Sequence, residues 1–526
     1  MKCFNVTGTC VGSEHYMVDI SKKLDEIEKL VERRQYFTIN RARQYGKTTT
    51  LFELARRLKQ RGGYTCALIS FETMGLDSFE TEKAFCDMFL GKISRALISS
   101  KEPEEYAKKW RDESVSGILS LSDHITNMCM DRKFVLMIDE VDKSSNNRMF
   151  LHFLGLLREK FQFRQQEQDY TFHSVILAGV TDIKNLKLKI INDGNYSTLK
   201  EEGRIANSPW NIAADFDVEM SFCTEDISLM LQEYEMDNKT GMDITVVANG
   251  ITTHTNGYPF LVSRICKHID EKLDKNWSPE GVEEAVRVVL GEVNVLFDDM
   301  AKNLRNFKNL HDFMYEILIV GETKMFNIDV LEVSLANAFG YIKKMNGSSK
   351  IAVSNRIFEI RMTHYFAAKD ENVQGKRSHG LIYQDVIKDG KFDMAVCLTK
   401  FAKYYREIYS EIDNKLLERH GRLLFLSFLT PLLNGQGFFH IETQLTDLRR
   451  MDIVVDFERH QQIVELKMWK GEAARKNAYD QLLGYMETKN ATEGFMLTFD
   501  FRKRKTKKYI AKWVEVGGRR IFDVVV

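Results

Sequence analysis

Residues 41–50, RARQYGKTTT, contain side chains that could bind the phosphate groups of a nucleotide. Gly46, Lys47 and Thr48 fill the last three positions of the phosphate-binding pattern GxxxxGK[ST], whereas Arg41 fills the first, where the pattern has glycine. The pattern needs small residues because backbone N–H groups must close around phosphate oxygens. A bare GK[ST] is a weak signal. Here it lies between the apolar run YFTIN and the helical stretch TTTLFELARRL, which is the strand–loop–helix order that such a loop requires.

A pair of acids at the end of another apolar run would complete a site for Mg²⁺ and ATP. The run FVLMIDE ends with Asp139, which could hold Mg²⁺ through water, and Glu140, which could polarise the attacking water. A third run, SVILAGV, is followed by Thr181 and Asp182, which either sense the γ-phosphate or only form a turn. The residues expected to contact the nucleotide are Gln44, Tyr45, Gly46, Lys47, Thr48, Thr49, Asp139 and Thr181, with Thr48 and Asp139 as the Mg²⁺ ligands.

Two carboxylates and a lysine near the C-terminus could cut phosphodiester bonds. The segment RRMDIVVDFERHQQIVELKMWKG contains two alternating runs around a polar turn, which is a hairpin signal. Folding it about residues 459–460 pairs Asp452 with Lys467 and Val454 with Glu465. Asp452, Glu465 and Lys467 then share one face, because side-chain direction repeats every two residues. Such acids bind Mg²⁺ or Mn²⁺, and the lysine orients water and stabilises charge on phosphate. A solvated strand face would show the same pattern.

Composition leaves several classes of protein without support. The 526 residues exceed one typical domain, and 44% hydrophobic and 29% charged residues suit globular cores. Lysine plus arginine and aspartate plus glutamate both number 75, so the net charge says nothing about partners. Eight scattered cysteines without a CxxC pair favour neither a zinc ribbon nor a disulfide framework. The start MKCFNVTGTC lacks a signal-peptide core and no run of about 18 apolar residues occurs, so we expect a cytoplasmic protein without a membrane span.

The pattern along the chain predicts an α/β fold in several parts. Residues 19–220 alternate helical segments with the apolar runs YFTIN, CALISF, FVLMIDE, SVILAGV and WNIAADF, which are typical of buried strands in a parallel sheet. Residues 221–365 are mostly helical in pattern, and a polar segment follows at 367–380. Residues 437–500 show strand-like alternation, a helix and another strand.

The N-terminal half resembles the AAA-ATPase-like family that carries a C-terminal nuclease-like domain in many bacteria. The segments that carry the resemblance are HYMVD (15–19), INRARQYGKTTTL (39–51), LMIDEVD (136–142), GVTDI (179–183), SPWNIAADF (208–216) and NGYPFLVSRIC (256–266). The family's loop often lacks the first glycine, so Arg41 is no departure from it.

This resemblance implies further contacts with the nucleotide. Asp19 and the two residues before it would lie near the adenine, and Gly257 and Pro259 would form a lid turn against the base or ribose. Arg264 would be a γ-phosphate sensor or an ordinary helix-surface arginine. No arginine finger is identifiable from the sequence, and the candidates by position only are Arg158 and Arg164.

The C-terminal segment resembles the PD-(D/E)xK nuclease superfamily. Its D-(x)n-ExK pattern fits Asp452, Glu465 and Lys467 with n equal to 12. The helix AARKNAYDQLLGYMETK presents Gln481 and Tyr485 four residues apart, where the superfamily has a QxxxY-like pair. The strand GFMLTF that follows fits the expected αβββαβ core.

The superfamily supplies another acid from a helix upstream of the strands. The helix IDNKLLERHGRLLFLSFL supplies Glu418, with His420 and Glu442 as nearby alternatives. The implied catalytic residues are Asp452, Glu465, Lys467, Gln481 and Glu418, with Asp452 and Glu465 as ligands of Mg²⁺ or Mn²⁺.

Two further segments bear on the domain organisation. SKIAVSNRIFEIRM (349–362) resembles the wing and last helix of a winged-helix domain, as in the regulatory STAND-type ATPases.

The basic tail FRKRKTKKYIAKWVEVGGRR, with Tyr509 and Trp513, either contacts nucleic acid or forms a solvated strand and helix surface. We expect a P-loop AAA-like ATPase core at 1–220, a helical lid at 221–290, a winged-helix-like part at 291–366 and a restriction-endonuclease-like α/β domain at 367–526.

These observations predict an ATP-binding and ATP-hydrolysing nuclease that cuts DNA phosphodiester bonds under nucleotide control, with Glu140 activating water for ATP hydrolysis. DNA is the preferred partner over RNA, and family resemblance alone suggests a role in defence against phage or mobile elements. The alternative is a STAND-like switch in which ATP drives homo-oligomerisation or docking of a regulatory partner, while the C-terminal domain only binds nucleic acid. A DNA-processing motor has the least support because no helicase motif occurs.

Overall fold

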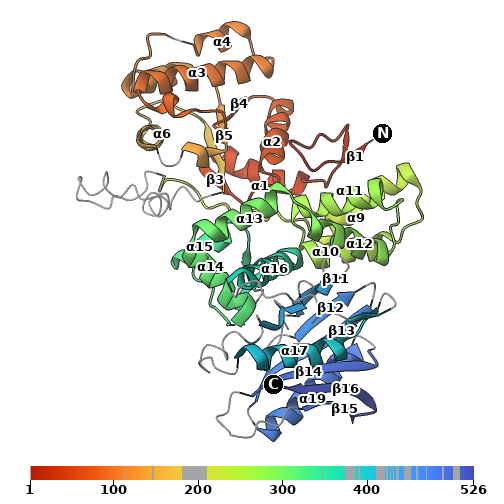
Figure 1. Cartoon of the computed structure of the whole chain (residues 1–526). Helices are drawn as coiled ribbons and strands as arrows, with labels where there is room; N and C mark the ends of the chain where they lie inside the picture. The colour runs from red at the N-terminus through yellow and green to blue at the C-terminus, as the bar shows by residue number, and fades with distance from the viewer. Residues whose placement is uncertain are drawn as a thin grey trace, which may run out of the picture. The chain divides into compact units, whose positions relative to one another are not determined.

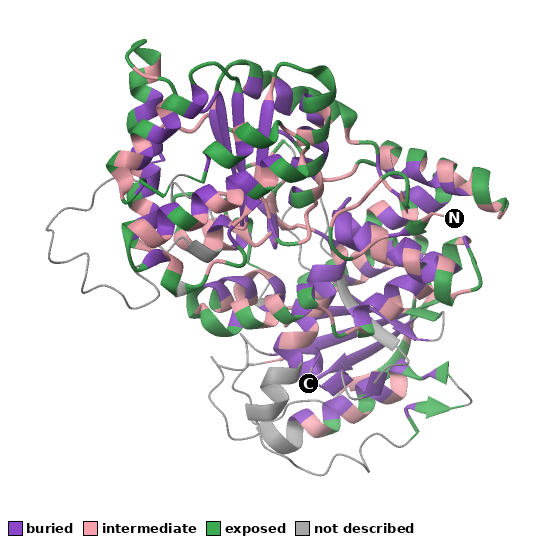
Figure 2. Cartoon of the chain, turned by 90° about the horizontal axis from the view of Figure 1, so that it is seen from above, coloured by how far each residue is buried: buried purple, intermediate pink, exposed green. Residues whose placement is uncertain are grey.

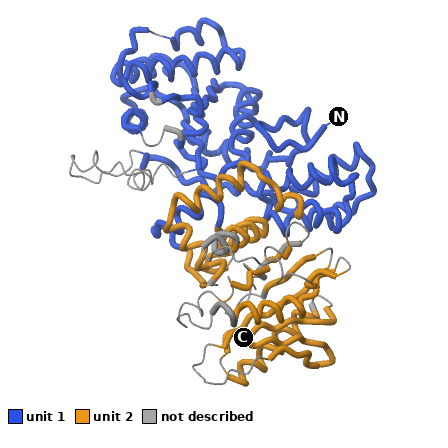
Figure 3. Tube along the Cα trace, in the orientation of Figure 1, with its two compact units in different colours: residues 1–285, 327–341 blue, residues 286–326, 342–526 orange. Residues whose placement is uncertain are grey.

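The computed structural model divides the chain into two compact units (Figures 1 and 3). The first unit comprises residues 1–285 and 327–341, and the second comprises residues 286–326 and 342–526. The structure describes residues 2–111, 113–144, 147–180, 210–320, 322–345, 347–373, 385–388, 391–409, 421, 424–426, 428–429, 432–433, 437–442, 452–457, 460–469, 471–488, 491–500 and 510–526.

A parallel sheet forms the centre of the first unit. Its four strands run in the order β3-β6-β5-β4, so β6 lies between β3 and β5. Their bounds are β3 Tyr36–Asn40, β4 Thr65–Ser70, β5 Phe134–Asp139 and β6 Ser174–Gly179. Four of the five expected strands are thus confirmed. The fifth run, WNIAADF, pairs with β3 only through the bridge between Phe37 and Ala214, because residues 210–212 form a turn that buries Trp210 against Thr38.

Helices cover both faces of this sheet, which explains why its strands are mostly apolar and almost entirely buried (Figure 2). Tyr36, Leu136 and Leu177 belong to one core cluster, whereas their neighbours Phe37 and Val135 belong to the other. The first cluster is completed by α3 Glu82–Ser99, α5 Ile118–Cys129 and α6 Arg148–Gln165, and the second by α1 Ser21–Glu32 and α2 Lys47–Arg61.

Four helices follow the sheet in sequence, in the region expected as a helical lid, and a short strand pair precedes it. They are α9 Thr224–Asn238, α10 Ile244–Thr255, α11 Pro259–Lys272 and α12 Pro279–Gly291, with β1 Cys3–Phe4 paired parallel to β2 His15–Tyr16. An aromatic cluster joins the strand pair to the helices, with ring centroids 4.9–6.0 Å apart for Phe4, Tyr16, Tyr234 and Trp277. Helix α15, Leu331–Ala338, also belongs to the first unit.

The second unit begins with helices and a small antiparallel hairpin. The elements are α13 Val295–Asn306, α14 Lys308–Tyr315, the π-helical turn Glu316–Val320, β7 Ile342–Lys344, β8 Ile351–Val353 and α16 Arg356–Val373. Residues 291–366, which we expected as one winged-helix-like part, are therefore shared between the two units.

A six-stranded mixed sheet dominates the rest of the second unit, in the order β11-β12-β13-β14-β16-β15. Its strands are β11 Gly437–Glu442, β12 Asp452–Phe457, β13 His460–Met468, β14 Glu493–Phe499, β15 Ile510–Val516 and β16 Arg519–Val525. Helix α19, Glu472–Thr488, packs on the face that carries Ile463 and Met496, and α17, Met394–Tyr409, packs against Phe499 on the other.

The register of the β12–β13 hairpin differs from the expected one by two residues. Phe457 pairs with His460 and Ile453 with Val464. The connection has two residues, the length that antiparallel hairpins prefer, rather than the longer polar turn expected from the sequence. Continuing the ladder by one position places Asp452 opposite Glu465. Because side-chain direction has a period of two, a shift of two leaves every residue on its expected face.

In the described part of the chain, no helix is long and apolar enough to cross a membrane. All eight cysteines are free thiols.

Candidate functional site

The phosphate-binding pattern forms the turn between β3 and α2. Gly46 caps α2 in a left-handed conformation, φ 78°, and Lys47 is the first helical residue. Lys47 is 6% exposed, and its Nζ donates to the carbonyl oxygens of Arg41 and Ala42 over 2.9 Å each. Burial lowers the pKa of Lys47, while the nearby acids Asp142, Glu140 and Asp139 oppose that shift. The α2 N-terminus thus offers unpaired N–H groups and a cation to an anion.

Asp139 lies at the end of β5, next to the start of α2. Thr48 Oγ1 donates to Asp139 Oδ2 over 2.5 Å, and Asp139 Oδ1 accepts from the backbone N–H of Glu140 over 2.9 Å. Asp139 is 5% exposed. A hydroxyl and a carboxylate in contact at a phosphate-binding loop are the donor set with which P-loop proteins hold Mg²⁺.

Glu140 has an unusual backbone. Its φ is +55°, in the left-handed region that costs a residue with a Cβ about 1 kcal/mol. Burial raises the pKa of its carboxyl, Lys47 opposes this, and Asp139 and Asp142 add to it. A strained acid beside the phosphate-binding lysine is typical of a functional site.

Asp142 is a third acid of this region, to which the sequence analysis assigned no role. Its Oδ2 accepts a hydrogen bond from the backbone N–H of Val180, at the end of β6. A Cβ at Gly179 would lie 2.8 Å from the same oxygen, so glycine leaves room for the contact. Asp142 therefore ties the loop after β5 to the end of β6. Thr181 and Asp182 follow directly, but they lie outside the described residues.

Arg41 occupies the glycine position of the pattern because its side chain supports the loop. Its Nη1 donates to the Asn40 carbonyl over 2.9 Å, its Nη2 donates to the Val218 carbonyl over 2.8 Å, and its guanidinium lies over the Phe216 ring. The loop residues with a left-handed backbone are instead Gln44, with φ +56°, and Gly46.

Tyr45 and Thr49 connect this turn to other parts of the first unit. The Tyr45 hydroxyl is 2.6 Å from Ser221 Oγ, and its ring packs edge-on against Tyr258 at 4.7 Å. Thr49 Oγ1 accepts from the backbone N–H of Cys10 over 3.1 Å. Both side chains thus have structural partners, and their contact with a nucleotide stays a prediction.

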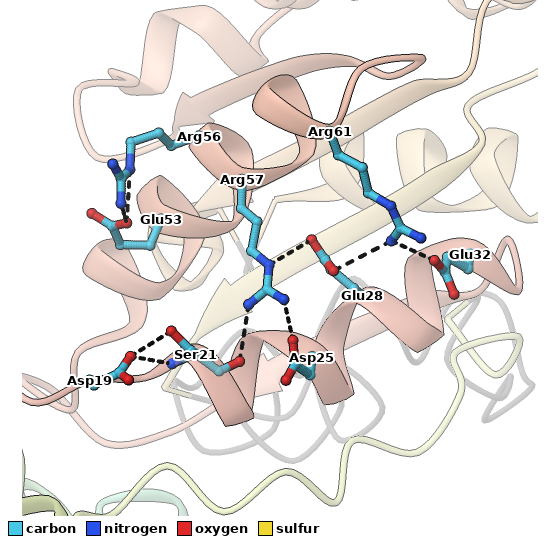
Figure 4. Close-up of polar contacts among 9 residues, drawn as sticks. All are labelled: Asp19, Ser21, Asp25, Glu28, Glu32, Glu53, Arg56, Arg57 and Arg61. Carbon is cyan, nitrogen blue, oxygen red and sulfur yellow. Dashed lines mark hydrogen bonds and ion pairs between the residues drawn. The ribbon is translucent and has the colours of Figure 1, made fainter.

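Asp19 lies just before α1 and bonds to its first residue. Its Oδ1 accepts from the backbone N–H of Ser21 over 2.9 Å and from the Ser21 hydroxyl over 2.5 Å, and these bonds lower its pKa (Figure 4). Arg57 of α2 bonds to the Ser21 carbonyl and pairs with Asp25 and Glu28, so one arginine fastens α2 to α1 (Figure 4). Contact of Asp19 with adenine stays a prediction.

The expected lid turn precedes α11. Gly257 has φ +69°, and a Cβ there would lie 1.8 Å from the Phe222 carbonyl oxygen, so only glycine fits. Pro259 is the first residue of α11, where its fixed φ suits a helix start, and Arg264 lies further along the same helix.

The arginine-finger candidates on α6 differ. Arg164 donates to the carbonyls of Phe172, His173 and Arg34. Its guanidinium therefore stabilises the end of α6 and is already engaged in bonds to the backbone. Arg158 is half-buried on the same helix.

The second unit brings together three of the residues expected in a nuclease site. Glu465 is fully buried on β13 and pairs with Lys467, which is 25% exposed. Lys467 Nζ also donates to Gln481 Oε1 on α19 over 3.1 Å. In register, Asp452 pairs with Glu442 on one side and stands opposite Glu465 on the other. Among the side chains that the structure describes, no group of three or more His, Cys, Asp or Glu residues could hold a metal ion, and the Asp452 side chain is outside that set.

The described residues do not include all of the expected nuclease residues. Glu418 and His420 lie outside the described residues. Tyr485 is buried in the core between α19 and the sheet.

One polar cluster under α19 was not anticipated from the sequence. Fully buried Asp523 on β16 pairs with Arg475 and accepts a 2.7 Å hydrogen bond from the Tyr479 hydroxyl. The register links Glu465 to Met496 and Met496 to Asp523, so both acids occupy one cross-strand row.

The described part of the basic tail is folded into the sheet. Arg519 donates to the carbonyls of Met486 and Ala491, and Arg520 pairs with Glu493 and lies over the Trp513 ring. Tyr509 lies outside the described residues.

The fold and the first site together define a P-loop ATPase core. Its features are a parallel sheet with β6 between the loop strand and the acid strand, a buried loop lysine, and a threonine bound to a strand-end aspartate. A family model described as AAA-like domain matches residues 9–359, more than half of the chain. The chain belongs to this AAA-like domain family, which confirms the expected ATPase domain.

Solved structures show more distant likeness. A Walker-type ATPase of Pyrococcus abyssi is 10% identical with a TM-score of 0.47, covering 68% of this chain and 99% of that chain. Cdc6p of Pyrobaculum aerophilum is 14% identical with a TM-score of 0.31, covering 65% and 93%. The ORC2 protein of Aeropyrum pernix, in ADPNP and ADP complexes, is 10% identical with a TM-score of 0.34, covering 67% and 97%. A comparison with curated proteins finds no match.

Proposed function

We propose that the chain binds and hydrolyses Mg–ATP in its first unit, and that the bound nucleotide controls a metal-dependent nuclease site in its C-terminal domain that cuts DNA. The observation that carries the ATPase part is the contact between Thr48 and Asp139 beside Lys47. These groups come from a loop and a strand end that only the parallel sheet brings together.

Each residue of the ATP site has a distinct role in this proposal. Lys47 leaves the loop carbonyls and binds the β- and γ-phosphates, which are richer in negative charge than carbonyl oxygens. Thr48 and Asp139 hold Mg²⁺, whose charge offsets that of the phosphates. Glu140 accepts a proton from the attacking water, and its raised pKa makes it a stronger base than an ordinary glutamate.

The nuclease part is supported by Glu465, Lys467 and Gln481. A fully buried carboxylate is costly unless it is paired or binds a cation. Asp452 and Glu465 would supply the oxygen donors that Mg²⁺ and Mn²⁺ prefer. A bound ion would supply a polarised water and charge neutralisation at the phosphate. Lys467 would orient that water, and Gln481 would hold the lysine in place.

The direct test compares wild type with Lys47→Ala, Glu140→Gln and Lys467→Ala. We expect ATP hydrolysis to fall at least about 100-fold in both ATP-site variants, with ATP binding retained in Glu140→Gln. Cleavage of plasmid, single-stranded DNA and RNA is measured with Mg²⁺ or Mn²⁺, with and without ATP. Cleavage that survives in Lys467→Ala would sink the nuclease assignment.

The second candidate is a switch in which ATP drives homo-oligomerisation or docking of a regulatory partner. The ion pair of Lys467 with Glu465 favours it in one respect, since such a pair also satisfies a buried acid without catalysis. The Glu140→Gln variant separates the candidates, because trapped ATP should change the mass of the particle whether or not DNA is cut. Hydrolysis stimulated by DNA would instead favour a motor, and a defence role would need a test in infected cells.

A further inference from the structure

Three consecutive carbonyl oxygens of the phosphate-binding loop accept side-chain hydrogen bonds. Those of Arg41 and Ala42 accept from Lys47, and that of Arg43 accepts from the hydroxyl of Tyr258. A loop that turns its N–H groups toward an anion turns its carbonyls outward, so these bonds stabilise the binding conformation. Lys47 must give up at least part of its bonding when it turns to a phosphate. Tyr258 does not compete for phosphate and can keep its bond.

Tyr258 belongs to the lid, between Gly257 and Pro259. It is 2% exposed, and its ring lies edge-on against Tyr45 at a centroid distance of 4.7 Å. One lid side chain thus contacts the backbone of one loop residue and the ring of another. The glycine turn before it and the start of α11 after it fix the position of Tyr258 in the structure.

Gly340 touches the same loop from the segment that follows α15. Its φ is +72°, and a Cβ there would lie 2.8 Å from the Ala42 Cβ and 3.8 Å from the Tyr258 ring. The turn at Gly340 is fixed by backbone bonds from Gly340 N–H to the Asn337 carbonyl and from Tyr341 N–H to the Ala336 carbonyl. The backbone at Gly340 therefore packs against Ala42 where any larger residue would push the two apart.

We propose that Tyr258 is a positioning residue for ATP binding, which holds residues 42–45 in their phosphate-binding conformation together with the backbone at Gly340. The inference rests on the proposed ATP site and assigns to Tyr258 a role separate from contact with the base or ribose. Because the backbone at Gly340 packs against Ala42, we expect residues 327–341 to respond to the occupancy of the loop.

The test uses the full chain as wild type, Tyr258→Phe and Tyr234→Phe. Tyr258→Phe removes one hydroxyl and keeps the ring. Tyr234→Phe is the matched control, because its buried hydroxyl donates to Asp270 inside the lid, over 2.6 Å, and touches no loop residue. Calorimetric titration with Mg–ATP should show a Kd about tenfold higher for Tyr258→Phe, which is the effect of one buried hydrogen bond. KM for ATP should rise with kcat unchanged, whereas Tyr234→Phe should keep both values.

Hydrogen exchange without nucleotide tests the same contact independently. Amides of residues 41–46 and 327–341 should exchange faster in Tyr258→Phe than in wild type and Tyr234→Phe. Equal exchange in all three proteins would overturn the inference. If wild type itself binds no ATP, the proposed function fails, while the exchange data still decide whether Tyr258 holds the loop.

A second pair of variants tests the contact at Gly340. Gly340→Ala should weaken ATP binding, because the new Cβ would lie too close to the Ala42 Cβ and because alanine would have to adopt a left-handed φ. Adding Ala42→Gly should recover part of the lost affinity, because it removes the Ala42 Cβ and leaves only the backbone strain at residue 340. No recovery in the double variant would show that the two residues do not touch.

Discussion

Thr48 on the first turn of α2 and Asp139 at the end of β5 are 91 residues apart in sequence, and their side chains are joined by a 2.5 Å hydrogen bond. The contact exists because parallel strands bring their carboxyl ends to one edge of the sheet, where the loop after β3 also turns into its helix. This single bond places a hydroxyl and a carboxylate close enough to serve one cation.

Thr48→Ala should remove the Mg²⁺-dependent part of ATP binding. We expect the affinity for Mg–ATP to fall at least about tenfold, while the affinity for ATP in EDTA stays unchanged, because only the metal ligand is lost. Thr48→Ser keeps the hydroxyl and is the matched control. Calorimetric titration of the three proteins checks this. Equal losses in Thr48→Ser and Thr48→Ala would contradict a role for the hydroxyl.

Arg41→Gly should restore the usual loop pattern and yet destabilise the protein. The change removes two hydrogen bonds to carbonyls and the contact with Phe216, and it adds backbone freedom, for a loss of about 2 kcal/mol in the free energy of unfolding. Urea unfolding measures this loss. ATP binding should stay within about fivefold of wild type. A stable variant with abolished binding would mean that Arg41 contacts the nucleotide.

Lys467→Met should destabilise the second unit as well as abolish any cleavage. It leaves the buried Glu465 without its ion pair, at a cost of roughly 2 kcal/mol, less than for a fully buried pair because Lys467 is 25% exposed. Adding Glu465→Gln should recover stability without recovering cleavage. Thermal unfolding and a plasmid assay on both variants separate the two effects. Cleavage by the stable double variant would exclude both residues from catalysis.

His173 should make the protein less stable below neutral pH. Burial, with Arg34, Arg164 and Lys133 nearby, lowers the pKa of His173 to about 4 from its ordinary value near 6.5. Above pH 6.5 both folded and unfolded states are neutral at this residue, and between 6.5 and 4 only the unfolded state binds the proton. The free energy of unfolding should therefore decrease as the pH is lowered from 6.5 to 4, by about 1–3 kcal/mol in total.

His173→Phe is the matched comparison, since it keeps a ring against Tyr64 without a proton to bind. Urea unfolding at pH 7.5, 6 and 5 should show a smaller loss for the variant than for wild type. Parallel pH profiles for the two proteins would exclude His173 as the cause.

The strands around the ATP site were predictable because their signal is local. Runs such as YFTIN and FVLMIDE are apolar on both faces, which only a sheet covered on both sides requires, and the polar residues that follow them mark the edge of the site. The hairpin at Asp452 and Glu465 was predictable in its faces but not in its register. Face depends on a period of two, whereas register depends on the length of the connection.

The supports of the loop were not predictable. Arg41 is held by Val218, the Arg43 carbonyl by Tyr258 and Ala42 by Gly340, and each partner comes from a distant segment. Neither Tyr258 nor Gly340 differs by type from many others in the chain, so only the folded structure distinguishes them. Asp142 follows Glu140 by two residues in the sequence, but its bond to Val180 depends on how two loops come together in the fold.

The assignment of residues 327–341 to the first unit, between two segments of the second, makes the two units inseparable by a single cut. A fragment ending at residue 285 would lack the backbone at Gly340, and one beginning at residue 286 would contain α15 without the rest of the first unit. A continuous fragment that contains all of the first unit must extend to residue 341, and it then includes residues 286–326 of the second unit.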